Sequence, residues 1–329
     1  TPGDDMAGRV KRLQSAPTEQ DRRGPRRSHV LRNEKRGEPS GQERSPRPRM
    51  GNRGRRSASK LASVALNHSP REAEQPAPPQ PSGPGLEILY GRQVVREALR
   101  AGRRRFVQVI LAEGIGMGGI VAEIVARARE RGCPVRTVLR AQLDALGVHH
   151  QGVAAEVGPF PYSDLDDLLK TAKARGEPPL LIILDHLQDP QNLGSLLRTA
   201  EAVGAHGAIL PERRAAGITP AVSHASAGAV EHFAIALMTN LARTIEYLKT
   251  QGIWLVGLEP GPQATPYDRA DLKGPLALVV GAEGAGLNRL VREKCDFLIS
   301  LPLAGHVASL NAAVAGAVAL YEARRQRAL

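Results

Sequence analysis

The sequence predicts an α/β fold with a mostly parallel sheet, preceded by a smaller α/β unit. Apolar runs and amphipathic stretches alternate along the chain from residue 86 to its end. Runs such as 180–184 and 276–280 are continuously apolar, which is typical of strands buried on both faces. Glycines and a few polar residues gather where such strands end, the position at which open α/β sheets bind ligands. The pattern therefore favours an enzyme over a scaffold protein.

The positive charge is concentrated at the N-terminal end of the chain. The formal net charge is +12, and residues 1–84 hold 18 Lys and Arg against 9 Asp and Glu, together with 12 of the 25 prolines. Such a segment cannot bury enough apolar surface to offset the entropy lost on ordering. We expect residues 1–85 to form a basic, Pro/Arg-rich disordered extension. Its arginine pairs suit phosphate contacts, and a purely solubilising role is the alternative.

Several classes of protein are disfavoured by composition. Cys133 and Cys295 are far apart, so neither a disulfide framework nor a zinc site is expected. No apolar run is long enough to span a membrane, and a reducing, cytoplasmic location fits both observations. The neighbours His149 and His150 have no third ligand nearby, so we expect RNA contact or a turn there, and no metal. Aromatic residues make up only 3% of the chain, too few for a base-stacking platform.

The first ordered part is expected over residues 86–160, as a small α/β domain. Periodicity predicts helices and strands in alternation, with helices at 92–100 and 120–131 and strands at 107–111, 135–139 and 153–157. Residues 161–178 are expected to be a linker that contains a helix at 163–175.

The second domain is expected over residues 179–329. Its predicted strands are 180–184, 208–210, 253–258, 276–280 and 298–301. Its predicted helices are 192–203, 219–227, 241–250, 288–294 and 309–327. Asn240 and Gly252 are expected to cap and terminate the helix that lies between them.

Three blocks at strand ends carry the candidate chemistry. In the first, Leu184 to Arg198, Asn192 stands at a predicted helix start, where its side chain can cap the helix or contact a substrate. Arg198 follows about 1.7 helical turns later, so the two reach one site only if the turn geometry allows it. A plain N-cap and a surface arginine remain the alternative.

The second block, Val279 to Leu287, is rich in glycine but is not a phosphate-binding loop. It has neither the Lys-Ser/Thr of a P-loop nor the strict spacing of a dinucleotide fingerprint. Glu283 would repel a phosphate, so a hydroxyl, an amine or a cationic ligand suits it better. A charge at a helix N-terminus is the alternative role.

The third block, Leu301 to Ala315, precedes and begins the last helix. Ser309 is a good N-cap, which is its ordinary role. A run of small residues over 312–319 allows close packing, and a second copy of the same helix is a natural partner.

Together the three blocks resemble the SpoU/TrmH family of RNA 2′-O-ribose methyltransferases, over residues 86–329. The chain is most similar to the RlmB branch, which methylates a guanosine in the peptidyl-transferase loop of 23S, large-subunit rRNA. The resemblance implies a SPOUT-type α/β-knot with a C-terminal trefoil, a homodimer, and S-adenosylmethionine (AdoMet) as cofactor. It also implies that the small domain over residues 86–160 binds the RNA substrate. The implied cofactor-binding residues are Leu258, Glu259, Gly281, Leu301, Ser309 and Leu310. The implied catalytic residues are Asn192, Arg198, Glu283, Ser309 and Asn311.

The chemistry of these residues sets further expectations. A guanidinium stays protonated, so Arg198 is expected to stabilise the developing alkoxide or to bind a phosphate. His306 departs from the family pattern; we interpret it as a substitution near the site rim, with proton transfer as the alternative. Ser226, Gly228 and Glu231 match a further family stretch and are expected to shape an RNA-facing surface. A tRNA ribose methyltransferase and a non-catalytic RNA-binding or ribosome-assembly protein are the rival functions.

Overall fold

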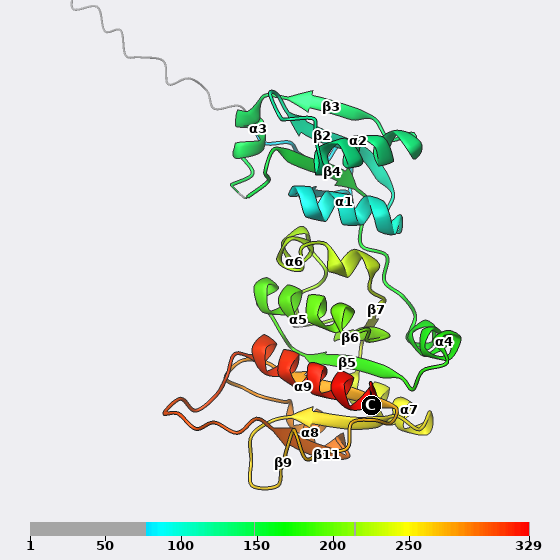
Figure 1. The fold of residues 1–329 in the computed structure, drawn as a ribbon, viewed down its shortest axis with the longest axis vertical. Helices are drawn as coiled ribbons and strands as arrows, with labels where there is room; N and C mark the ends of the chain where they lie inside the picture. Colours follow the sequence, from blue (N-terminus) through cyan, green and yellow to red (C-terminus); the bar gives the residue numbers. More distant parts are fainter. Residues whose placement is uncertain (1–76, 148, 214, 329) are drawn as a thin grey trace, which may run out of the picture. The chain divides into compact units, whose positions relative to one another are not determined.

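The computed structural model describes residues 77–147, 149–213 and 215–328. The predicted basic extension therefore lies, over residues 1–76, outside the described residues. The described part belongs to one compact unit that contains two separate sheets (Figure 1). We call residues 86–160 the small domain and residues 179–329 the large domain.

The small domain is built on a four-stranded mixed sheet in the order β1-β4-β2-β3. Its strands are Glu87–Tyr90, Phe106–Ala112, Val135–Val138 and Val153–Val157, numbered β1 to β4. Helices α1 (Arg92–Ala101) and α2 (Ile120–Glu130) share one apolar core with the sheet, and the short α3 (Arg140–Asp144) packs on the other face. The sequence did not predict β1 or α3, because each is too short for its periodicity to be visible.

The large domain confirms the predicted parallel sheet. Seven strands lie in the order β7-β6-β5-β10-β8-β11-β9, and every pair of neighbours is parallel. Their bounds are Leu180–Asp185 (β5), Gly207–Pro211 (β6), Ile235–Met238 (β7), Trp254–Leu258 (β8), Thr265–Pro266 (β9), Leu276–Gly281 (β10) and Phe297–Ser300 (β11). Only β7 and β9 were missed from the sequence.

Helices cover both faces of this sheet, as expected. They are α4 (Leu165–Arg175), α5 (Pro190–Ala202), α6 (Pro220–Ala225), the 3₁₀ turn η1 (Ala229–His232), α7 (Leu241–Thr250), α8 (Arg289–Lys294) and α9 (Ala312–Arg327). Along β5, Ile182 and Leu184 share a core with α5 and α9 on one face. Leu181 and Ile183 share a core with α4, α7 and α8 on the other. The alternation explains why the strand is continuously apolar.

Two helix starts differ from the sequence prediction, and each difference releases a candidate site residue from the capping role considered for it. Helix α5 begins at Pro190, and Asp189 is its N-cap, accepting hydrogen bonds from the backbone N–H groups of Gln191 and Asn192. The plain N-cap alternative for Asn192 is therefore wrong. Helix α9 is capped by Asn311, so the expected N-cap role of Ser309 is wrong as well.

Ser226, Gly228 and Glu231, which are expected to shape an RNA-facing surface, are themselves buried, and that expectation stays a prediction. Ser226 is 0% exposed and Glu231 is 1% exposed. A Cβ atom at Gly228 would lie 2.8 Å from the Cβ atom of Glu97 in α1. This stretch packs on the small domain, and Ser226, Ala227 and Ala229 also line a hollow beside α1.

The adjacent residues His149 and His150 differ in environment, and His150 makes hydrogen bonds that stabilise the turn before β4. His150 is buried; its Nε2 atom lies 2.9 Å from Asp144 Oδ1, and its Nδ1 atom accepts a hydrogen bond from the Gly152 backbone N–H. His149 is exposed. Within the described ranges, no helix is long and apolar enough to cross a membrane, and no cluster of His, Cys, Asp and Glu has the arrangement of a metal site.

Candidate active site

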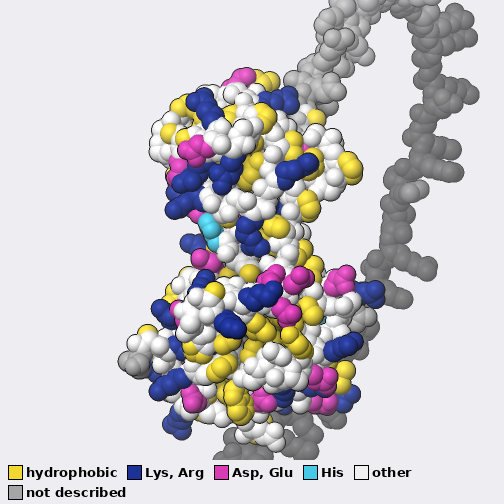
Figure 2. All heavy atoms as spheres, turned by 90° about the vertical axis from the view of Figure 1, so that its right-hand side faces the viewer, with side chains coloured by type: hydrophobic (Ala, Val, Ile, Leu, Met, Phe, Trp, Pro, Cys, Tyr) yellow, Lys and Arg dark blue, Asp and Glu magenta, His cyan; other side chains and the backbone are white. Residues whose placement is uncertain are grey.

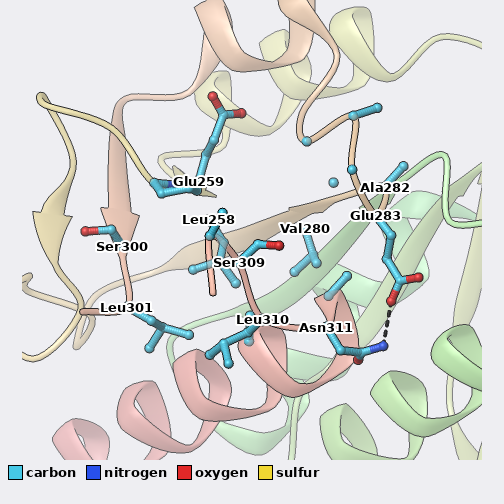
Figure 3. Close-up of a pocket in the computed structure, with 18 of the residues that line it drawn as sticks. Leu258, Glu259, Val280, Ala282, Glu283, Ser300, Leu301, Ser309, Leu310 and Asn311 are labelled. Carbon is cyan, nitrogen blue, oxygen red and sulfur yellow. Dashed lines mark hydrogen bonds between the residues drawn. The ribbon is translucent and has the colours of Figure 1, made fainter. Parts of the chain in front are cut away.

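A pocket of about 630 Å³ lies where β8, β10 and β11 end. Since parallel strands end at the same edge of a sheet, the loops that follow them meet there. The pocket is lined by Leu258 to Pro260, Val280 to Gly286, Ser300, Leu301, Leu303, Ala308 to Ala312 and Ala315 (Figure 3). All six residues predicted to bind the cofactor, Leu258, Glu259, Gly281, Leu301, Ser309 and Leu310, are among them.

The second block forms a closed loop over one side of this pocket. Ala282 and Gly286 pair as an isolated bridge, which brings Gly286 back over Gly281. A Cβ atom at Gly281 would lie 2.3 Å from the carbonyl carbon and oxygen of Gly286. Only glycine fits at this close approach between two backbone segments.

Two carboxylates anchor the end of this loop. Asp185, at the end of β5, is 1% exposed and accepts a 2.6 Å hydrogen bond from the backbone N–H of Asn288. Glu259 accepts a 3.2 Å bond from the backbone N–H of Leu287 and pairs with Arg292 at 3.1 Å. Asp185 is not among the predicted site residues, although an acidic residue at the end of a buried apolar strand is a signal visible in the sequence.

The three blocks meet in a triangle of polar side chains at the rim of the pocket. The amide of Asn192 donates to Glu283 Oε1 at 2.8 Å. The amide of Asn311 donates to the same oxygen at 2.5 Å and to Asn192 Oδ1 at 2.9 Å. The Glu283–Asn311 bond is drawn in Figure 3. Glu283 lies in the loop before α8, so the alternative role of a helix N-terminal charge is wrong.

Arg198 is not brought to this pocket within the chain. It is exposed on α5 and lines a separate hollow of about 700 Å³, together with Arg96 and Arg100 of α1. His306 is exposed and does not line the pocket. Of the five predicted catalytic residues, Asn192, Glu283, Ser309 and Asn311 therefore surround one opening, and Arg198 stands apart.

A thiol nucleophile is excluded near the site. Cys295 lies behind β8, where a Cβ atom at Gly257 would come within 3.1 Å of its Sγ atom. Burial, reinforced by the charge of Asp296, raises the pKa of Cys295 to about 12. The thiol is therefore protonated at neutral pH, and covalent catalysis through it is not available.

The lining suits an amphipathic nucleoside-type ligand with a cationic centre. Apolar side chains such as Leu258, Leu301 and Leu310 can hold a flat ring, while the backbone of the glycine loop offers hydrogen bonds. The hydroxyl of Ser309 is available to hydroxyl or amine groups, whereas the carboxylate of Glu259 is held by Leu287 and Arg292. The carboxylate of Glu283 favours a positive charge at the rim, so the residues present fit S-adenosylmethionine.

Comparison with known proteins is consistent with this geometry. Residues 179–321 match the SpoU rRNA Methylase family, and residues 88–163 match the RNA 2′-O ribose methyltransferase substrate binding family. YacO of Bacillus subtilis, whose name assigns it to the TrmH family of tRNA/rRNA methyltransferases, is 46% identical over 242 residues, which are 73% of this chain and 96% of that protein. The chain belongs to the SpoU/TrmH family of RNA methyltransferases. A Staphylococcus aureus relative whose name assigns it to the same family is 44% identical over 241 residues, with the same shares covered.

Similar solved structures show which fold and which cofactor this member of the SpoU/TrmH family has. The SpoU methyltransferase AviRb of Streptomyces viridochromogenes, in complex with AdoMet, superposes with a TM-score of 0.63 at 27% identity, over 74% of this chain and 91% of that one. The AdoMet-bound rRNA methyltransferase of Sinorhizobium meliloti gives 0.61 at 26% identity, over 73% and 87%. These neighbours confirm the expected SPOUT-type fold, and the cofactor is S-adenosylmethionine.

Proposed function

We propose that the protein methylates the 2′-hydroxyl of a guanosine in the peptidyl-transferase loop of 23S rRNA. The observation that carries this proposal is the polar triangle of Asn192, Glu283 and Asn311 at the mouth of the cofactor pocket. It offers amide and carboxylate groups where a ribose would meet the transferable methyl group. The small domain, which matches a substrate-binding family, supplies a separate RNA surface. Lys and Arg side chains are frequent on its visible face (Figure 2).

Methyl transfer from this cofactor requires little acid–base catalysis by the protein, because the leaving group is neutral. S-adenosylmethionine would supply a methyl group bound to a positively charged sulfonium. The leaving group would be the rest of the cofactor, whose sulfur becomes a neutral thioether. Held by pocket residues such as Leu258, Gly281 and Leu310, the cofactor would supply the methyl group to the ribose oxygen, while the hydroxyl proton would pass to water. The triangle orients the ribose, and orientation alone lowers such barriers by roughly 7–11 kcal/mol at best. Ser309, beside the triangle, completes the proposed set of ribose contacts.

Arg198 has the proposed role of stabilising the developing alkoxide or the adjacent phosphate. A guanidinium is always charged, so it serves as an electrostatic partner and not as a base. Its place on the exposed side of α5, away from the pocket of its own chain, leads us to propose that it acts on the pocket of a second copy. The proposed assembly is thus a homodimer. The surface that supports it is an apolar stripe on α9, of Val314, Val318 and Tyr321, which are 51%, 37% and 58% exposed.

A tRNA substrate is the second candidate, because the names of the similar Bacillus and Staphylococcus proteins cover both tRNA and rRNA. We also propose a division of labour along the chain. The small domain (86–160) binds RNA, the large domain (179–329) carries out the transfer, the linker (161–178) joins them, and residues 1–85 form a basic extension. A cytoplasmic location is proposed on the two unpaired cysteines, of which Cys133 is buried.

The deciding experiment is methylation in vitro of a 23S rRNA fragment and of a tRNA pool, with the modified nucleotide mapped by mass spectrometry. We expect one 2′-O-methylguanosine in the rRNA fragment. Methylation of tRNA alone would overturn the rRNA assignment. Arg198→Ala is expected to abolish transfer while AdoMet affinity, measured by calorimetry, is retained. Normal turnover by that variant would remove Arg198 from the mechanism.

A further inference from the structure

The two sheets are joined by a contact that the catalytic chemistry does not use. Elements β1 and α1 of the small domain pack on α6 and η1 of the large domain (Figure 1). Arg104, between α1 and β2, lies at the centre of this contact, and its side chain is 0% exposed. A fully buried arginine is rare unless its charge and its donors are satisfied.

The guanidinium of Arg104 is satisfied from both domains at once. In the large domain, its Nε and Nη2 atoms donate to the two carboxylate oxygens of Glu231, at 2.8 and 3.1 Å. Ser223 donates to the same carboxylate at 3.0 Å. In the small domain, Nη1 donates to Glu87 Oε2 at 2.6 Å and to the carbonyl of Gly158 at 3.2 Å. The forked geometry, with partners in both domains, restricts how the two domains can be oriented relative to each other.

Neighbouring contacts reinforce this orientation at the start of the linker. Arg103 donates to the carbonyl of Phe233 at 2.6 Å and to that of Pro161 at 3.0 Å. The guanidinium carbons of Arg103 and Arg104 lie 5.5 and 5.2 Å from the centre of the Phe160 ring. Such cation–π contacts also depend on a defined geometry.

A buried ion pair is a poor source of stability, because desolvation offsets most of the attraction. Its directional bonds do specify one arrangement, whereas an apolar contact tolerates sliding. Glu231 does not line the cofactor pocket, so the pair has no direct part in the transfer. A role in fixing the angle between the domains accounts for both its burial and its distance from the chemistry.

The hollow beside this contact contains residues of both domains, so its shape depends on the angle between the small and the large domain. It is lined by Arg96 and Arg100 of α1 and by Arg198 of α5. Any rotation of the small domain would therefore move the two α1 guanidinium groups relative to Arg198. RNA held by the small domain would be displaced from the large domain in the same motion.

We propose that Arg104 and Glu231 are positioning residues, which lock the small domain at the one angle that delivers RNA to the active site. The inference rests on the proposed function, because it concerns delivery of the same RNA substrate. It predicts that the pair governs RNA kinetics and leaves the cofactor pocket unchanged.

The first test replaces Arg104 by methionine, which keeps the length and removes the charge. We expect kcat/KM for the rRNA fragment to fall about tenfold to a hundredfold, the cost typical of a misplaced substrate, with AdoMet affinity unchanged. Arg140→Met is the matched control, since Arg140 belongs to the same domain and its side chain is 64% exposed. If Arg104→Met stays within twofold of the control, the positioning role is overturned.

A double variant keeps the test valid if a lone buried charge prevents folding. Arg104→Met combined with Glu231→Leu removes both fully buried charges, a replacement that is often neutral for stability. The remaining partner, Glu87, has a side chain that is 26% exposed and can be solvated. We expect this variant to bind AdoMet normally and to be as impaired with RNA as the single variant. Wild-type kinetics in the double variant would show that the pair merely neutralises itself, and would overturn the proposal.

The opposite side of the contact provides an independent variant. Gly228→Ala would place a methyl group 2.8 Å from Glu97 Cβ in α1, at a backbone φ of +86°. Gly204→Ala is its matched control, with φ of +80° and no heavy atom within 4 Å of the added carbon. We expect only Gly228→Ala to reduce kcat/KM for RNA and to change the small-angle X-ray scattering profile.

Failure of the inference and failure of the proposed function would look different. A wild-type protein that methylates no guanosine in the rRNA fragment contradicts the proposed function. The inference is then judged on scattering and on RNA affinity measured by filter binding. If Arg104→Met and Gly228→Ala have the scattering profile and RNA affinity of the wild type, the two residues have no positioning role.

Discussion

Asn311 combines two roles that the sequence left open. Its Oδ1 atom accepts hydrogen bonds from the backbone N–H groups of Ala313 and Val314, which caps α9. Its Nδ2 atom donates to Glu283 and Asn192 at the pocket rim. One side chain therefore fixes the last helix and completes the proposed site.

The two roles can be separated by Asn311→Asp. Aspartate caps a helix as well as asparagine does, but it cannot donate to Glu283. The cap is kept, but the new carboxylate faces that of Glu283, so we expect some loss of thermal stability at pH 8 that recovers at lower pH, where the pair takes up a proton. We expect a loss of about a hundredfold in kcat/KM, the cost of a misplaced substrate. Asn311→Ala loses the cap too and is expected to cost about 1 kcal/mol of stability. Full activity in Asn311→Asp, measured by methyl transfer to RNA, would contradict the proposed role.

His206 gives the fold a dependence on pH that is unrelated to the site. It is 2% exposed, and its Nδ1 atom accepts a hydrogen bond from the Leu180 backbone N–H. Burial, with the charge of Arg175, lowers the pKa of His206 from its ordinary 6.5, against the opposing charge of Glu177. The folded protein therefore keeps this imidazole neutral at pH values where the unfolded chain protonates it.

The lowered pKa of His206 makes the folded protein less stable at acidic pH than at neutral pH. The contribution is fully present above pH 6.5 and is lost as the pH falls below it, because only the unfolded chain takes up the proton in that window. We expect the melting temperature of the wild type to fall more steeply between pH 8 and pH 5 than that of His206→Asn, which keeps an acceptor for Leu180. Parallel curves would show that His206 contributes nothing to the slope.

At the scale of elements, the sequence predicted the parallel strands well because their burial makes them continuously apolar. The strands that it missed, β1, β7 and β9, are short, and they are defined by pairing with distant segments. Helix starts were harder to place, since several residues near a helix end compete to cap it. Asp189 prevails over Asn192 at α5, and only the folded backbone shows which of them reaches the free N–H groups.

The glycine loop after β10 allows a test at the same scale. Gly281→Ala places a methyl group 2.3 Å from the Gly286 carbonyl, so the loop must open or shift. We expect a loss of about 1–3 kcal/mol of stability, typical of overpacking, and a loss of AdoMet binding measured by calorimetry. Gly305→Ala is the control, because nothing lies within 4 Å of its added carbon. Unchanged AdoMet affinity in Gly281→Ala would show that the loop does not hold the cofactor.

At the scale of the whole molecule, the pocket and its proposed arginine are separated within one chain. The sequence predicted the lining residues through the family resemblance, but spacing along a helix could not show which face of α5 carries Arg198. In the structure, Arg198 lines the hollow beside α1 and does not line the pocket beside the polar triangle. A homodimer is proposed to reunite them.

Mixed dimers test this arrangement directly. Arg198→Ala and Asn311→Asp are each expected to be inactive alone. When both chains are denatured and refolded together, a pocket with an intact Asn311 meets Arg198 of the partner subunit, and about a quarter of wild-type activity should return by random pairing of subunits. Sedimentation velocity checks the assembly, and Val318→Asp on the apolar stripe is expected to give monomers. No recovery in mixtures confirmed as dimers would mean that Arg198 does not act across the interface.

Strand β10 lies between β5 and β8, although the chain makes β6, β7 and β8 first. Until β10 inserts, the sheet of β7, β6 and β5 keeps an unpaired edge at β5, and β8 has no neighbour, because β11 is made after β10. Closing the sheet therefore needs contacts between segments distant in sequence. Such unfinished species are prone to aggregate. The protein should therefore be most vulnerable while it is being made, and its yield in cells should respond to growth temperature and chaperone supply more than the finished enzyme responds to heat.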